Sequence, residues 1–213
     1  MNKRIDNVWG NVENMWSDQT AQKSTLEQRA VKRIIKNKEL HFKKAKALSD
    51  LCEKPKQGEQ WRIVTEKQFN AFAVILNVLQ EEIIEELYLA IYRINEPTVA
   101  SIIDYIESGK IKRAYFVISN FFNQTKKPER WAMQLKEFAN KNKNTKHIYI
   151  HNHSKCLAVK TKDNYYVFEG SGNMSDNARI EQYVYENNKE VFEFHKKWIG
   201  ELCNEKAKAS SKR

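Results

Sequence analysis

The chain has 213 residues, of which 41% are hydrophobic and 30% charged, and its formal net charge is +10. This composition supports a folded core and excludes a mainly disordered, collagen-like or low-complexity protein. The three cysteines, at positions 52, 156 and 203, are too few and too scattered for a disulfide framework or a cysteine-rich zinc site.

The first residues do not have the pattern of a secretion signal. Residues 1–11 carry charged and polar side chains where a signal peptide needs an unbroken apolar run. No later stretch approaches the roughly 18 consecutive apolar residues that predict a membrane span. We therefore expect a cytoplasmic protein in a reducing compartment, without stable membrane insertion.

The positive charge is concentrated at the two ends of the chain. Residues 1–57 hold 13 Lys and Arg against 7 Asp and Glu, whereas residues 58–205 balance at 20 against 20. The last eight residues add four positive charges and no negative ones. Such clusters bind polyanions through release of counterions, which makes nucleic acid the expected partner, although they could also be ordinary solvated surface.

Helical spacing predicts a basic helical arm over residues 1–57. No glycine or proline occurs between Gly10 and Pro55, and the breaker residues at 53–58 end the segment. We expect three parts: the arm, a domain at 58–205 and a basic tail at 206–213. The apolar residues that recur at helical spacing in the arm are Leu26, Ala30, Ile34, Phe42, Ala45, Leu48 and Cys52.

The middle of the chain alternates between strand and helix patterns. This alternation predicts an α/β layered domain with a mixed, largely parallel sheet flanked by helices. The expected strands are 87–94, 114–119 and 147–151, and the expected helices cover 69–87, 96–106 and 128–141.

Further along the chain, the runs 155–160 and 165–169 flank a polar turn and predict a hairpin. A strand at 182–185 and a helix at 191–203 complete the domain. Ligands of open α/β sheets bind beyond the carboxyl ends of the strands. The substrate-binding candidates at those ends are Arg93, Asn95, Ser119 and Asn120, together with the region after Ile150.

That last region carries a motif. His153 and Lys155 form His-x-Lys, and Asp163 follows after seven residues. After six intervening residues come Gly170, Ser171, Gly172 and Asn173, and Glu181 precedes the next apolar run.

This pattern resembles the phospholipase D superfamily motif His-x-Lys-(x4)-Asp-(x6)-Gly-Ser-x-Asn over about residues 61–205. The longer gap before Asp163 departs from the motif and leaves the role of that residue open. The resemblance implies a phospholipase D-like fold, a covalent phosphohistidine and two His-x-Lys motifs for each site. The catalytic residues that it implies are His153, Lys155, Ser171, Asn173 and Glu181, and Gly170 and Gly172 shape the loop that binds substrate.

The residue types favour phosphate chemistry independently of the resemblance. Alternation along a strand would place His153 and Lys155 on one face, so that both converge on one phosphate. His151 would share that face and could line the site. Ser171 and Asn173 add hydrogen-bond donors, and Lys155 neutralises developing charge, so we expect no metal or other cofactor.

The expected function is a metal-independent phosphodiesterase, most simply a nuclease. Two alternatives remain: a nucleic-acid-binding protein without activity, and an enzyme that acts on phospholipids. A second tripeptide of this form, His41-Phe-Lys43, lacks a Gly-Ser-x-Asn loop, and His195 is assigned to packing. The chain holds one full motif, so we expect a symmetric homodimer that joins two copies through the active-site face.

Overall fold

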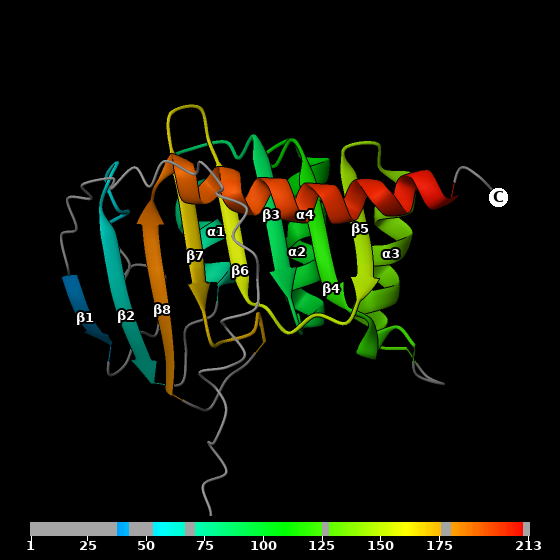
Figure 1. Cartoon of the computed structure of the whole chain (residues 1–213), viewed down its shortest axis with the longest axis horizontal. Helices are drawn as coiled ribbons and strands as arrows, with labels where there is room; N and C mark the ends of the chain where they lie inside the picture. The colour runs from blue at the N-terminus through cyan, green and yellow to red at the C-terminus, as the bar shows by residue number, and fades with distance from the viewer. Residues whose placement is uncertain (1–37, 43–52, 67–70, 125–127, 176–179, 211–213) are drawn as a thin grey trace, which may run out of the picture. The chain divides into compact units, whose positions relative to one another are not determined.

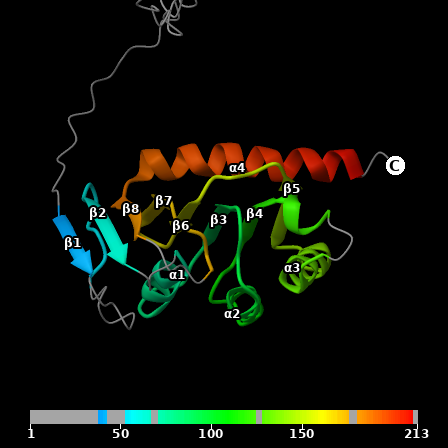
Figure 2. The ribbon, with the colours of Figure 1, turned by 90° about the horizontal axis from the view of Figure 1, so that it is seen from below.

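The computed structural model describes residues 38–42, 53–66, 71–124, 128–175 and 180–210. They belong to a compact unit that runs from Arg33 to Arg213. This unit is an α/β layered domain, with one mixed sheet between helices on both of its faces (Figures 1 and 2). The α/β architecture expected from the sequence is confirmed.

The sheet has eight strands in the order β1-β2-β8-β7-β6-β3-β4-β5. Three neighbouring pairs are parallel, namely β1–β2, β3–β4 and β4–β5. The other four pairs are antiparallel, so the expectation of a largely parallel sheet is wrong. The strands are β1 (Lys38–Phe42), β2 (Gln60–Glu66), β3 (Glu86–Ile91), β4 (Ala114–Ser119), β5 (Thr145–Ile150), β6 (Cys156–Lys160), β7 (Tyr165–Gly170) and β8 (Ile180–Asn187).

The lengths of the connections between strands explain why some neighbouring strands are parallel and others antiparallel. Helices α2 (Glu96–Glu107) and α3 (Arg130–Lys141) lie between β3, β4 and β5, and a crossover of this length returns the chain in parallel. The turn at 161–164 joins β6 directly to β7, which forces the antiparallel pairing predicted for this hairpin.

Three helices cover one face of the sheet and a single long helix crosses the other (Figure 2). Helices α1 (Phe72–Leu79), α2 and α3 form the first layer, and α4 (Lys189–Ser210) forms the second. Strand β3 lies between them and is buried on both faces. Its side chains contribute alternately to the two hydrophobic clusters of the unit, with Leu89 in one and Ala90 in the other. This two-sided burial accounts for the continuous apolar run in the sequence.

Two expected helices differ in length from the structure. The pattern at 69–87 yields only α1, because Glu86 and Leu87 already belong to β3. The last helix is longer than 191–203 and continues through Ser210, so it includes the first residues of the expected basic tail.

The expected helical arm is wrong at residues 38–42. This segment forms β1, which pairs in parallel with β2 from Lys38↔Trp61 to Phe42↔Thr65. The outer edge of β2 would otherwise present unpaired backbone groups, and such an edge readily accepts another strand. The rest of the arm, residues 1–37 and 43–52, lies outside the described residues.

The breaker segment at 53–58 is bound to the sheet. Asn187 at the end of β8 donates from Nδ2 to the carbonyl oxygen of buried Pro55 at 3.2 Å, and its own carbonyl oxygen accepts from the amide of Gly58 at 2.9 Å. Residues 53–58 are therefore an ordered part of the same unit and lead directly into β2. In the described ranges, no helix is long and apolar enough to cross a membrane.

Candidate active site

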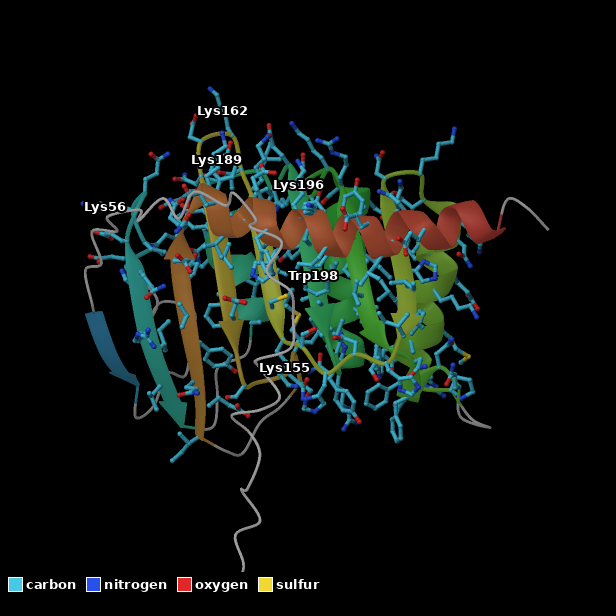
Figure 3. All side chains as sticks on the ribbon, viewed as in Figure 1. Lys56, Lys155, Lys162, Lys189, Lys196 and Trp198 are labelled. Atoms are coloured by element: carbon cyan, nitrogen blue, oxygen red, sulfur yellow. The ribbon has the colours of Figure 1, made fainter. Side chains whose placement is uncertain are left out.

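Except for Asp163, the motif residues gather at one end of the strands, which we call the active-site edge of the sheet. The edge is formed by the carboxyl ends of β3, β4 and β7 and by the start of β6 (Figure 1). Figure 3 shows Lys155 at this edge and Lys162 at the opposite one. Because parallel strands end there, the position agrees with the general rule for ligand sites in α/β sheets.

The segment that joins β5 to β6 carries His153 across the ends of the parallel strands. Asn152 holds it in place, because its Nδ2 donates to the carbonyl oxygens of Ile91, at 3.1 Å, and Val117, at 3.0 Å. Its Oδ1 accepts from the Ser154 amide at 3.0 Å. Asn152 was not among the residues predicted from the sequence. Its position between the two histidines was the only signal, and it could be interpreted only once the strand order was known.

His153 and Lys155 converge, although not for the reason expected. Both precede β6 and lie outside any strand, so the argument from strand alternation is wrong for them and for His151. Instead the Lys155 side chain folds back. Its Nζ donates to the His153 carbonyl oxygen at 2.7 Å and lies 3.2 Å from His153 Nδ1.

Tyr92, directly after β3, supports this pair. Its ring centroid lies 4.9 Å from that of the His153 imidazole, and the Lys155 ammonium lies 5.7 Å from the centre of the Tyr92 ring. An ammonium at this distance is attracted by the ring face. Tyr92 was not predicted from the sequence, because it lies in an apolar run whose residues all resemble core.

Burial lowers the pKa of the Lys155 ammonium below its ordinary value, and the Glu181 carboxylate nearby offsets part of this shift. Desolvation penalises the charged form of a lysine, whereas a neighbouring negative charge stabilises it. Lys155 and Glu181 are thus electrostatically coupled, as their proposed roles at one site require.

The Gly-Ser-x-Asn loop, which begins at the last residue of β7, lies against the segment that carries His153 and Lys155. The Gly170 amide donates to the Lys155 carbonyl oxygen at 3.1 Å, which connects the His-x-Lys segment to the Gly-Ser-x-Asn loop. The Ser171 hydroxyl hydrogen-bonds the Glu181 carboxylate and accepts from the Gln182 amide at 3.1 Å. The structure therefore brings together His153, Lys155, Ser171 and Glu181 along one edge of the sheet.

Asn173 has a positioning contact. Its Oδ1 accepts from the Arg93 amide at 3.3 Å, and the Met174 amide donates to the Arg93 carbonyl oxygen at 3.1 Å. These bonds hold the loop to the end of β3. Arg93 itself is exposed, and its guanidinium carbon lies 5.7 Å from the centre of the Phe122 ring.

Glycine is required at two positions of the loop by contact with Tyr183. A Cβ on Gly170 would lie 2.2 Å from Tyr183 Cδ1 and 2.3 Å from the Gln182 carbonyl oxygen. A Cβ on Gly172 would lie 1.8 Å from the Tyr183 hydroxyl oxygen. The Tyr183 ring therefore packs directly on the backbone at Gly170 and Gly172, the two neighbours of Ser171.

We expect Gly170→Ala to lower the free energy of unfolding by about 2 kcal/mol or more, because the backbone contact cannot relax without separating β7 from β8. Gly200→Ala is the matched control. In α4 the nearest atom to the new methyl group would be 3.9 Å away, so this change should be neutral or stabilising by up to about 1 kcal/mol. Chemical denaturation of both variants measures the difference, and equal stabilities would contradict the packing described.

Two of the predicted substrate-binding residues cap helices. The Asn95 side chain accepts from the Thr98 amide at 3.0 Å and so caps α2. Ser119 accepts from the Phe121 amide at 3.4 Å and caps the short turn Asn120–Phe122. The side chain of Asn95 therefore serves to cap α2, whereas that of Ser119 also lines a cavity beside the site.

Asp163 is not brought to the site. It lies in the turn between β6 and β7, and the five residues of β6 place it roughly 16 Å or more from Lys155. Its carbonyl oxygen accepts from Gln57 Nε2 at 2.9 Å. The role left open for Asp163 is thus confined to the opposite edge of the sheet.

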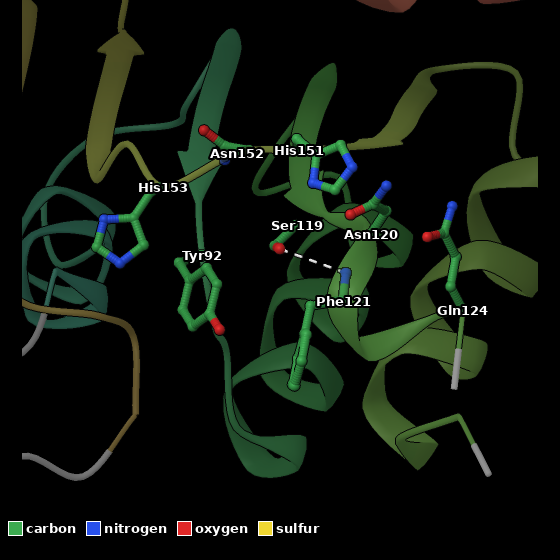
Figure 4. Close-up of a pocket in the computed structure, with 8 residues that line it drawn as sticks. All are labelled: Tyr92, Ser119, Asn120, Phe121, Gln124, His151, Asn152 and His153. Atoms are coloured by element: carbon green, nitrogen blue, oxygen red, sulfur yellow. Dashed lines mark hydrogen bonds between the residues drawn. The ribbon is translucent and has the colours of Figure 1, made fainter. Parts of the chain in front are cut away.

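A cavity of about 560 Å³ opens beside His153 (Figure 4). Its walls come from the ends of β3 and β4 and from the segment after β5. It includes two of the predicted substrate-binding residues, Ser119 and Asn120, and the histidine whose role was left open, His151. The lining residues are Tyr92, Ser119, Asn120, Phe121, Gln124, His151, Asn152 and His153.

His195 has the packing role expected of it. It is buried, its Nε2 lies 3.1 Å from Glu169 Oε1, and its Nδ1 accepts from Trp198 Nε1 at 3.1 Å. The hydrogen bond from His195 is the largest influence on Glu169 and lowers the pKa of that carboxyl group. Within the described ranges, no three His, Cys, Asp or Glu side chains form a group that could hold a metal ion.

Comparison of the sequence with protein-family models and with curated proteins finds no match.

Proposed function

We propose that the chain is a metal-independent phosphodiesterase of the phospholipase D type that cleaves nucleic acid. The observation that carries this proposal is the pairing of His153 with Lys155, whose Nζ lies 3.2 Å from His153 Nδ1. The Gly-Ser-x-Asn loop lies beside this pair and is hydrogen-bonded to the same segment. An imidazole can act as nucleophile or acid, and an ammonium ion stabilises the negative charge of a phosphoryl transition state.

In the first step, a ring nitrogen of His153 donates its electron pair to phosphorus. The bond from phosphorus to the leaving oxygen breaks, and a second histidine gives that oxygen a proton. In the second step, this histidine removes a proton from water, the resulting hydroxide attacks phosphorus, and the phosphorus–nitrogen bond breaks. Lys155 shifts from His153 Nδ1 to the phosphate oxygens, where Ser171 and Asn173 add neutral donors.

A second copy of the chain is the proposed source of the second histidine. Each chain holds one complete set of His-x-Lys and Gly-Ser-x-Asn, and a twofold axis at the active-site edge would join two such sets. The two steps would then require the His153 ring of one copy to act as the nucleophile and that of the other copy to act as the proton donor.

The charge distribution favours nucleic acid over lipid as substrate. The arm at 1–57 and the last eight residues carry the whole positive excess of the chain. Lys and Arg clusters of this kind neutralise successive phosphates along a strand. A protein that binds nucleic acid without cleaving it is the second candidate, because the charge pattern would serve it equally.

One assay separates these functions. Wild-type protein and His153→Ala are incubated in EDTA with plasmid DNA, with RNA and with anionic phospholipid vesicles. Cleavage of DNA or RNA by the wild type alone supports the proposal. Retarded but intact nucleic acid indicates the binding protein, and turnover of lipid alone indicates the phospholipid enzyme. Either of the last two results overturns the proposal.

We expect the alkaline limb of the activity profile to lie below the ordinary lysine pKa of about 10.4. Burial lowers the pKa of Lys155, so the ammonium loses its charge at a lower pH than a solvated lysine. Glu181→Gln removes the charge that offsets this shift, and should move the limb to still lower pH in the residual activity. Glu190→Gln, on the exposed start of α4, is the control. The measurement is kcat/KM against pH, and an unmoved limb in Glu181→Gln would contradict the coupling.

A further inference from the structure

Aromatic rings continue from the proposed phosphate site into the cavity beside it. The His153 ring lies 4.9 Å from the Tyr92 ring, and the Tyr92 ring lies 6.4 Å from the Phe121 ring. Figure 4 shows Tyr92 between the other two rings. The first ring of this row belongs to the proposed nucleophile, and the last, Phe121, is exposed.

Phe121 is an exposed ring held in a fixed position. It is 59% exposed, although the part of the chain described buries most of its large apolar side chains. Its ring is nearly parallel to Tyr92, at 28°, and contacts Phe122 edge-on at 5.1 Å. Phe122 is buried and packs on Trp131 at 5.3 Å. A ring braced in this way loses little conformational freedom when a ligand stacks on it.

Polar groups line the same cavity. Figure 4 shows the amides of Asn120 and Gln124 beside the His151 imidazole. Asn120 is 8% exposed, so its amide is largely withdrawn from bulk water. An amide offers both donors and an acceptor, and an imidazole adds a further nitrogen, which together match the edge of a nucleobase. An acyl chain would leave these groups without partners, which disfavours lipid as the occupant.

We propose that this cavity binds an unpaired nucleobase that stacks on Phe121 while an adjacent phosphate of its strand lies at His153 and Lys155. The inference rests on the proposed function and specifies its substrate class. Both faces of a base inside a duplex are covered by its neighbours, so it cannot stack on a protein ring. The substrate is therefore single-stranded nucleic acid, or a nucleotide extruded from a duplex.

The test uses binding and cleavage of three ligands of equal length: a single-stranded oligonucleotide, its duplex, and the same strand with abasic sites. Binding is measured by fluorescence anisotropy with His153→Ala, which does not cleave, with and without Phe121→Ala. Loss of one base–aromatic stack should weaken binding of the single strand about 5-fold to 100-fold and leave the abasic strand unchanged. Phe121→Trp should restore binding. Phe194→Ala removes an equally exposed ring from α4, 64% exposed, and should have no effect.

Cleavage by the full chain distinguishes the two proposals. Turnover by the wild type, together with equal binding of single and abasic strands in all variants, overturns the base site and leaves the phosphodiesterase standing. No turnover of any ligand, together with selective loss of single-strand binding in Phe121→Ala, overturns the phosphodiesterase and supports the base site.

Discussion

His153→Ala is expected to lower kcat for phosphodiester cleavage by at least about 10³-fold, because the substitution removes both the nucleophile and the second histidine from a dimeric site. His153 is exposed, so its loss should leave the fold intact. Single-turnover cleavage of an oligonucleotide in EDTA measures the effect, and circular dichroism verifies the fold.

His41→Ala is the matched control for this substitution. His41 belongs to a second His-x-Lys tripeptide, His41-Phe-Lys43, but it lies in β1 at the far end of the strand order from β4 and β5. Its replacement should leave kcat unchanged. A folded His153→Ala protein that retains wild-type kcat would contradict the assignment of the nucleophile.

Mixed dimers should be inactive, because each composite site needs His153 from both copies. When equal amounts of wild type and His153→Ala exchange subunits freely, about one quarter of the dimers contain two wild-type chains. Turnover should then fall to about one quarter of that of wild type alone at the same total protein concentration. An excess of the variant should suppress it further.

Independent sites would instead retain about one half of the turnover, and this result would contradict the shared site. A mixture of wild type with His41→Ala controls for effects of mixing and should remain fully active. Sedimentation at the assay concentration must also show a dimer, since full turnover by a monomer would exclude a second histidine from another copy.

The sequence predicted those elements whose signals are local. Strand β4 could be predicted because its residues form a short apolar run, and the β6–β7 hairpin because a polar turn separates two such runs. Strand β1 could not, because its conformation depends on pairing with β2, about 20 residues further along the chain. The sheet is mixed, as predicted, but the predominance of parallel pairs was predicted wrongly for a similar reason, since it depends on which strands become neighbours.

The same distinction between local signals and contacts of distant segments applies to the candidate site. The motif identified His153, Lys155, Ser171 and Glu181, which the structure gathers at one edge. Asn152 and Tyr92 hold the histidine segment, but their roles arise from the crossing of that segment over other strands. The capping role of Asn95 was a local signal that was overlooked, because an asparagine directly before Glu-Pro is a typical helix start.

The most direct test of the central claim is the stereochemistry of cleavage at phosphorus. The full chain, in EDTA, is given a phosphorothioate diester of known configuration with isotopically labelled water, and the configuration of the product is determined. Each in-line displacement inverts phosphorus, so a covalent His153 intermediate followed by hydrolysis predicts overall retention. Inversion would show a single direct attack by water and would contradict the phosphohistidine mechanism proposed for this site.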